Sequence, residues 1–149
     1  MTRESPITEP ELPIALAQQA LRFAASLDLK EVRYFAIENI PFSFRPVPSV
    51  NPRTQLPNEA PAEFHYNYAH GMGWMWTIYI WEDLPEKVQR VLLLHEIIEV
   101  LFIKQHQLGS PQAHQATLPY EAEFIHLLDL TEDERKILED LRKQYSKNN

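Results

Sequence analysis

The sequence predicts an α+β fold, in which an N-terminal helix and a small β-sheet with a hairpin precede the C-terminal helices. Three observations support this prediction. Apolar residues recur at helical spacing over residues 11–27. Aromatic and polar residues alternate over residues 63–81, as they do in half-buried strands. From residue 84 onward, helix start and stop signals frame three segments with helical patterns.

Length and composition favour one globular domain over residues 1–149. The chain is 44% hydrophobic, which is enough for one core. Its longest apolar run is shorter than the ~18 residues that a membrane helix needs. Residues 1–6 lack the apolar region of a signal peptide. We therefore expect a cytoplasmic protein with no membrane partner, and the sequence indicates no particular oligomeric state.

Charge and cysteine content exclude several classes of function. The formal net charge of -7 disfavours binding to a nucleic-acid backbone. The lack of cysteine excludes disulfide scaffolds, thiolate zinc sites and thiol nucleophiles. Any metal ion must therefore be held by His, Asp, Glu or backbone oxygen atoms.

The N-terminal part of the chain predicts one helix, one strand and a long loop. Residues 1–10 are polar and contain proline, so we expect a loose tail. The helix is expected over residues 11–27 and the strand over residues 32–37, a short run of β-branched and aromatic residues. Residues 41–61 are rich in proline and show no periodicity, so we expect an irregular loop.

Residues 63–81 predict a hairpin with its turn at residues 71–73, where two of the three residues are glycine. Phe64, Tyr66 and Tyr68 alternate with polar residues in the first strand, and the second strand is aromatic and β-branched. We expect the aromatic residues of the second strand to form part of the sheet core and surface rather than to bind a ligand: Trp74, Trp76, Tyr79 and Trp81.

Three helices are expected in the C-terminal half. The first begins near Pro85, a favoured first-turn residue, and ends just before Gly109, which stops it. The second covers about residues 110–129, with a kink or a break at Pro119. A capping-box pattern at the start of residues 131–145 predicts the third.

The segment His95-Glu96-Ile97-Ile98-Glu99 carries the functional signal. It lies within an apolar run, residues 91–103, that predicts a helix buried on most sides. Burying an imidazole and two carboxylates costs free energy unless they are paired or bind a metal ion. His95 and Glu99 are four residues apart, so they project from one face and can hold one ion. Glu96 occupies the general-base position of the His-Glu-x-x-His motif, so we expect it to be the catalytic residue.

A simpler interpretation of the same segment is that both glutamates face solvent and that His95 makes an ordinary hydrogen bond in the core. The cost of burying charge disfavours it, because the apolar residues on every side of this helix leave its polar groups few other partners.

A zinc site needs a third protein ligand, and the next helix offers two candidates. His114 follows a turn, and a helix hairpin would bring it back toward His95. With Glu99 these residues make a His₂Glu ligand set, which leaves a divalent ion with a net positive charge. Glu121, two helical turns beyond His114, would cancel that charge. We therefore favour His114 and keep Glu121 as the alternative third ligand or as a partner of a ligand.

At these residues the chain resembles the zincin-like metallopeptidases, in particular the small ImmA/IrrE-like type. Residues 95–99 are similar to the His-Glu-x-x-His helix of that family, with Glu99 in place of the second His. Residues 120–128 are similar to its downstream Glu-Ala segment, in an imperfect register. The resemblance implies a zincin-like fold over about residues 12–129, with an active-site helix over a cleft.

The same resemblance implies roles for individual residues. His95 becomes a metal ligand, Glu96 the general base and Glu121 the third ligand. The last of these conflicts with the charge argument for His114. In zincins an edge strand lines the cleft and pairs with an extended peptide, and either strand of the hairpin would serve here.

Two functions follow from these observations. The first is a zinc-dependent peptidase acting on a peptide or protein, although iron, nickel or manganese would also suit His and carboxylate ligands. The second is a non-catalytic module on the same fold that binds a peptide or a regulatory partner, because Glu99 stands where a His is expected. For His65 and His70 we expect ordinary roles in the hairpin.

Overall fold

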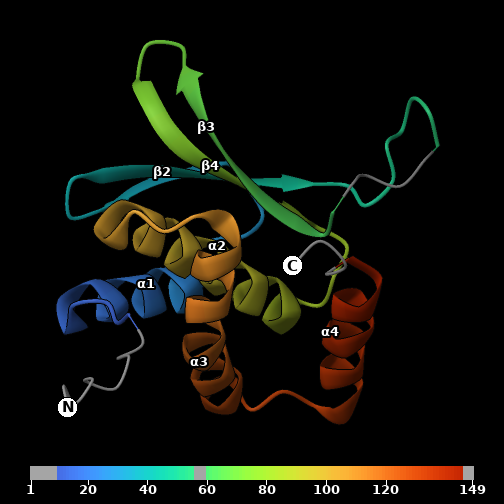
Figure 1. The fold of residues 1–149 in the computed structure, drawn as a ribbon. Coiled ribbons are helices and arrows are strands. Elements are labelled where there is room, and N and C mark those ends of the chain that lie inside the picture. The colour runs from blue at the N-terminus through green and yellow to red at the C-terminus, as the bar shows by residue number, and fades with distance from the viewer. Residues whose placement is uncertain (1–9, 56–59, 146–149) are drawn as a thin grey trace, which may run out of the picture.

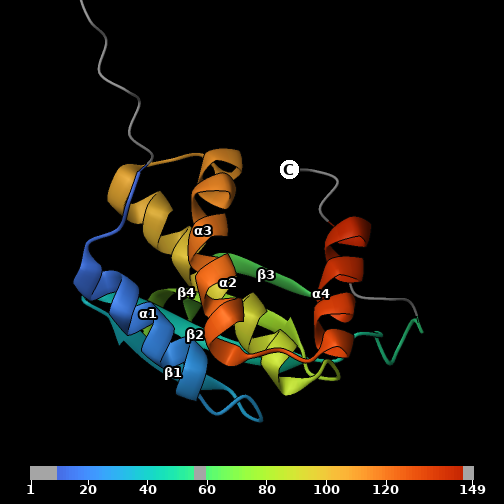
Figure 2. The same ribbon diagram turned by 90° about the horizontal axis from the view of Figure 1, so that it is seen from below.

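The structure is a computed structural model that describes residues 10–55 and 60–145. Within these ranges the fold is α+β, with four helices and a four-stranded sheet. The helices are α1 (Ile14–Ser26), α2 (Glu86–His106), α3 (Ser110–Leu128) and α4 (Glu132–Tyr145). The strands are β1 (Arg33–Ile37), β2 (Ile40–Val47), β3 (Ala62–Ala69) and β4 (Gly73–Trp81). The helices gather on one face of the sheet (Figures 1 and 2).

The sheet has the strand order β1-β2-β4-β3. β1 and β2 form one antiparallel pair, β3 and β4 form the predicted hairpin, and β2 runs parallel to β4. Both glycines of the hairpin turn have positive φ angles, 80° at Gly71 and 103° at Gly73, which residues with a side chain rarely adopt. β3 lies at an edge of the sheet, and its outer side pairs with no strand among the described residues.

The prediction of an irregular loop over residues 41–61 was wrong for its first part, which forms strand β2. Pro41 lies before the pairing with β4 begins, and Pro46 lies beyond the last residue paired with β1. Each proline can therefore turn its nitrogen, which carries no hydrogen, to a side without a partner strand. Between them, Phe42 and Phe44 alternate with polar residues and point into the core. The number of prolines in this segment obscured the two-residue alternation of apolar and polar side chains.

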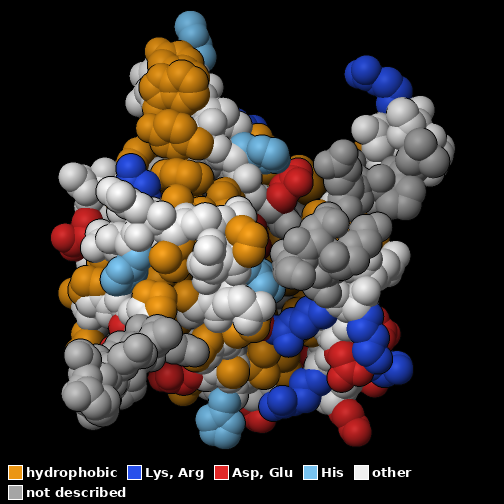
Figure 3. All heavy atoms as spheres, viewed as in Figure 1, with side chains coloured by type: hydrophobic (Ala, Val, Ile, Leu, Met, Phe, Trp, Pro, Cys, Tyr) orange, Lys and Arg blue, Asp and Glu red, His pale blue; other side chains and the backbone are white. Residues whose placement is uncertain are grey.

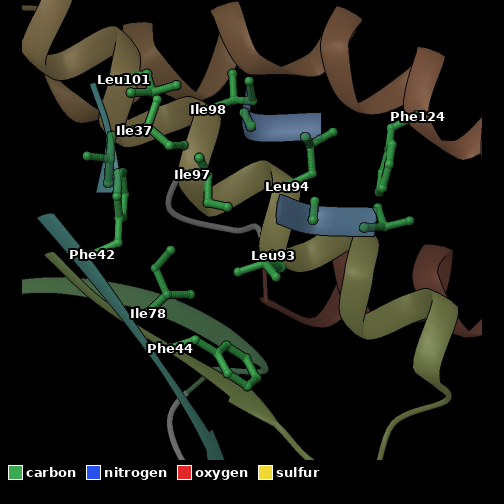
Figure 4. Packing of buried hydrophobic residues seen from close by; sticks show 14 of the residues in the cluster. Ile37, Phe42, Phe44, Ile78, Leu93, Leu94, Ile97, Ile98, Leu101 and Phe124 are labelled. Carbon is green, nitrogen blue, oxygen red and sulfur yellow. The ribbon is translucent and has the colours of Figure 1, made fainter. Parts of the chain in front are cut away.

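Helix α2 forms the centre of the core, as its apolar sequence predicts. Thirteen of its residues are buried, so it is covered on almost every side. Figure 4 shows Leu93 and Ile97 on the side of α2 that faces Phe42, Phe44 and Ile78 of the sheet. Because α1, α3 and the sheet all pack against α2, polar side chains on this helix are held in fixed positions by the surrounding core.

Other helix boundaries depart from the sequence prediction. Gly109 does not stop α2; Gln107 takes the left-handed conformation after it, and Gly109 is the N-cap residue of α3 in an extended conformation. Ser110 and Pro111 explain this, since proline favours the first turn of a helix. α3 continues through Pro119 without a break.

The capping box before α4 is confirmed. The backbone N–H of Glu134 donates to the hydroxyl of Thr131, and the backbone N–H of Thr131 donates to the carboxylate of Glu134. The predicted tail over residues 1–10 lies, apart from residue 10, outside the described residues, as do residues 56–59 of the predicted loop. Among the described helices, none is long and apolar enough to cross a membrane.

Candidate metal centre

Helix α2 brings His95, Glu96 and Glu99 to one cavity. All three are buried, with 7 to 8% of each residue exposed. They line a cavity of about 590 Å³. His95 and Glu99 are one helical turn apart, and the Oε1 atom of Glu99 lies 3.0 Å from Nε2 of His95. The two side chains are therefore already in contact along the helix.

Helix α3 adds His114 to this pair. Its Nδ1 atom lies 3.1 Å from Nε2 of His95 and 3.7 Å from Oε1 of Glu99. The burial of His114 lowers the pKa of its imidazole, and the positive charge of a protonated His95 lowers it further. His114 is therefore biased toward the neutral form, which is the form that binds metal ions.

The distances among these three atoms suit a metal ion. Ligand atoms bound tetrahedrally to zinc at 2.0–2.2 Å lie roughly 3.3–3.6 Å from one another. The observed separations of 3.0, 3.1 and 3.7 Å bracket that range. The buried group formed by His95, Glu99 and His114 could thus hold a metal ion with small movements of its side chains.

Glu121 touches the opposite nitrogen of His95. Its Oε1 atom lies 2.9 Å from Nδ1, and its Oε2 atom forms an ion pair with Arg142 of α4. A carboxylate in this position favours the tautomer that carries its proton on Nδ1. The lone pair on Nε2 of His95 then points toward Glu99 and His114.

With this tautomer, two electron-rich atoms face each other at the centre of the cluster. Nε2 of a neutral His95 and the Glu99 carboxylate both present lone pairs, 3.0 Å apart, and these repel each other. A proton or a metal cation among the three atoms removes that repulsion. The cluster is therefore suited either to a bound cation or to a shared proton.

Glu96 lies beside the cluster and faces the same cavity. Its burial raises the pKa of its carboxyl to about 8; the negative charges of Glu99 and Glu63 act in the same direction, and the positive charge of His95 opposes them. A carboxyl with a raised pKa binds a proton more readily than an ordinary glutamate does. A general base that works near neutral pH needs this property.

The cavity extends from the cluster to the edge of the sheet. Ala62, Glu63 and Phe64, at the start of edge strand β3, form one wall, and Leu141 and Tyr145 of α4 belong to another. The backbone of β3 has no partner on its outer side among the described strands. An extended chain entering the cavity could therefore pair with outer backbone groups of β3 that bind no other described strand.

The structure brings together all the predicted site residues: Glu96, His95, Glu99, His114 and Glu121. It places His114 and Glu121 on different nitrogen atoms of His95, so the two are not equivalent candidates. His65 and His70 are exposed in the hairpin and do not line the cavity. Sequence reasoning missed Arg142, because only the packing of α4 brings it to Glu121.

Comparisons of the chain with family models, with curated proteins and with solved structures found no match. The functional argument therefore rests on the residues and geometry of the site itself.

Proposed function

We propose that this protein is a metal-dependent hydrolase that cleaves peptide bonds, with zinc as the first candidate for the ion. The observation that carries the proposal is the convergence of the three ligand atoms of His95, Glu99 and His114 beside Glu96 in one cavity. The resemblance of residues 95–99 and 120–128 to zincin-like metallopeptidases supports the same reaction class.

The ligand assignment follows from charge and position. His95 and His114 supply neutral nitrogen atoms and Glu99 supplies one carboxylate, so a divalent ion retains a net positive charge. When bound, such an ion provides Lewis-acid chemistry, because it polarises a carbonyl group and acidifies water. Glu121 is a positioning residue in this scheme, since it contacts the far side of His95 and holds the ring in orientation.

Glu96 is the proposed general base. Its carboxylate takes a proton from the attacking water and returns that proton to the leaving nitrogen of the cleaved bond. Its place in the chain suits this role, because it is adjacent to His95 but lies about 100° further round the helix, where it avoids the ligand positions. Its burial raises the pKa of its carboxyl to about 8, and the positive charge of a bound ion would favour the ionised form that acts as the base.

The edge strand β3 supplies the argument for a peptide substrate. A polypeptide in extended form can add to a free sheet edge through backbone hydrogen bonds, whatever its side chains. The start of β3 lies in the wall of the cavity that contains His95 and Glu96. A peptide paired with β3 would therefore pass the proposed catalytic group.

Metal binding is the first test. Protein stripped with a chelator should bind one zinc ion per chain, and saturating zinc at about 100 times Kd should stabilise the fold by about 2.7 kcal/mol. Calorimetric titration and thermal unfolding measure both effects. His114→Ala should abolish them, whereas His126→Ala, an exposed control on the same helix, should retain them. A wild-type chain that binds no divalent metal and gains no stability would exclude the proposal.

Hydrolysis is the second test. Metal-loaded protein is incubated with a mixture of peptides, and mass spectrometry detects the products. Glu96→Gln should retain the metal and lose turnover by at least about 100-fold, which is the lower range for a general base. Equal turnover by the wild type and Glu96→Gln would contradict the assigned role of Glu96.

One observation favours the alternative of a non-catalytic peptide-binding or regulatory module. The polar groups of the cluster also contact one another, so His95, Glu99 and His114 form a hydrogen-bonded network once they share a proton. In such a network the polar groups satisfy one another's hydrogen bonds without a metal ion. Peptide binding without cleavage, retained in Glu96→Gln, would support this alternative over the hydrolase.

A further inference from the structure

The face of the sheet that carries Ile78 continues beyond the helices as a row of aromatic side chains. Phe64, Tyr66 and Tyr68 of β3 lie opposite Ile78, Trp76 and Trp74 of β4. We call Tyr66, Tyr68, Trp74 and Trp76 the aromatic platform. Residues directly opposite each other in an antiparallel pair share a face, so these four rings lie on one surface.

The outer part of the platform, Tyr68 and Trp74, lies on the part of the hairpin that extends past the rest of the sheet. The pairing of β2 with β4 begins at Trp76, so the tip of the hairpin has only two strands. The exposed fractions are 52% for Tyr66, 58% for Tyr68 and 57% for Trp74. Figure 3 shows hydrophobic side chains in a continuous stripe along this projecting hairpin (Figure 1).

The rings are ordered by contacts with one another. Tyr66 stacks on Trp74 with centroids 5.5 Å apart and contacts Trp76 at 4.9 Å, and Tyr68 meets Trp74 edge to face at 5.8 Å. These pairs stabilise the hairpin, but they use only the sides of the rings that face each other. The outer surfaces remain exposed, which is unusual for so many large aromatic groups in one place.

The platform is continuous with the candidate metal centre. Phe64 lines the cavity and also packs edge to face against Trp76, with centroids 5.6 Å apart. From Phe64 to Tyr68 the strand covers four residues, or about 13 Å at the rise of a β-strand. One edge strand therefore leads from the cavity wall to the exposed rings.

We propose that the aromatic platform binds large apolar side chains of the polypeptide that occupies the cavity. The inference rests on the proposed function, to which it adds a substrate class: extended peptides with large apolar residues at alternate positions, several residues from the bond that is cleaved. A strand paired with the outer edge of β3 turns every second side chain to the face that carries the platform. Tyr66 and Tyr68 are the members of the platform nearest to such side chains.

Charge and geometry favour a polypeptide over other occupants. The net charge of -7 disfavours nucleic acids, whose bases would otherwise stack on such rings. The same charge opposes anionic membranes. The free edge of β3 offers backbone hydrogen bonds that a polypeptide can satisfy along its length and that a lipid surface cannot.

The test uses the metal-loaded Glu96→Gln protein, so that bound peptide is not cleaved. Extended peptides long enough to reach from the cavity to the hairpin tip carry either Phe or Ser at alternate distal positions, and calorimetry measures their Kd. The Phe peptide should bind about tenfold more tightly than the Ser peptide, which is ~1.4 kcal/mol. Adding Tyr68→Ser and Trp74→Ser should remove that difference, whereas Tyr34→Ser, an exposed aromatic residue on β1, should preserve it.

The outcomes separate the platform from the hydrolase. In one outcome the wild type cleaves both peptides at equal rates while Glu96→Gln binds both with equal Kd values. That result would overturn the platform and leave the hydrolase intact. Preferential binding of the Phe peptide without cleavage would support the platform and count against the hydrolase. A blue shift of tryptophan fluorescence with phosphatidylcholine vesicles, but with neither peptide, would also overturn the inference, because it assigns the rings to a lipid surface.

Discussion

Glu121 and His95 lie on different helices and meet through a contact of 2.9 Å between Oε1 and Nδ1. The contact matters because it involves the nitrogen of His95 that faces away from Glu99 and His114. It leaves the other nitrogen, Nε2, directed at both of them. A single carboxylate on α3 thus determines which atom of His95 is presented to the candidate metal centre.

Replacing Glu121 should weaken metal binding without removing a ligand. Glu121→Gln keeps the shape of the side chain but removes its charge, so it orients the imidazole less firmly and makes it a weaker base. Loss of such a partner typically lowers metal affinity by about 10–100-fold. Calorimetric titration with zinc measures the change. Glu123→Gln on the exposed face of the same helix is the control, and equal affinities for the two variants would show that Glu121 has no such role.

Arg142→Ala should destabilise the fold. The side chain of Glu121 is 5% exposed and loses its ion-pair partner, which leaves a buried charge poorly compensated. Because the Arg142 side chain is 44% exposed, water can partly replace it, and we expect a loss of about 1–2 kcal/mol rather than the 3–5 kcal/mol of a fully buried pair. Urea denaturation measures the loss. Lys143→Ala, in an exposed pair with Glu139, should change stability by less than about 0.5 kcal/mol.

Glu96→Gln should stabilise the metal-free protein at neutral and higher pH. The folded state raises the pKa of Glu96 from 4.5 to about 8, so it holds a proton that the unfolded state has released within this range. The contribution of Glu96 to stability therefore falls as pH rises from about 4.5 to about 8. Thermal unfolding in chelator at pH 4 and pH 8 should show the gain for Glu96→Gln at pH 8 alone. A gain that is the same at both pH values would argue against a raised pKa.

Removing the capping box should weaken the attachment of α4. Thr131→Ala deletes the hydroxyl that accepts a hydrogen bond from Glu134, at a cost of about 1 kcal/mol. Hydrogen exchange should become faster in the first turn of α4. Thr131→Ser retains a hydroxyl and should behave like the wild type; if it behaves like Thr131→Ala, the hydrogen bond is not the cause.

The hairpin and the capping box could be read from the sequence because their signals are local. Alternating aromatic residues and two turn glycines predict the hairpin, and a threonine three residues before a glutamate predicts the cap. Strand β2 escaped prediction, because two prolines obscured the alternation of Phe42 and Phe44. Whether a proline can sit in a strand depends on which neighbouring strands pair there, and that is a property of the assembled sheet.

By itself the sequence determined that His95, Glu96 and Glu99 share a buried helix with His95 and Glu99 on one face. Helical geometry and the cost of isolated buried charge are sufficient for that conclusion. Only the tertiary structure decided that His114 lies at Nε2 of His95 and Glu121 at Nδ1. This arrangement depends on how α3 is rotated about its axis and shifted along it relative to α2. The packing of the whole core sets both, and no local sequence pattern encodes them. The contact with Arg142 depends in the same way on how α4 packs.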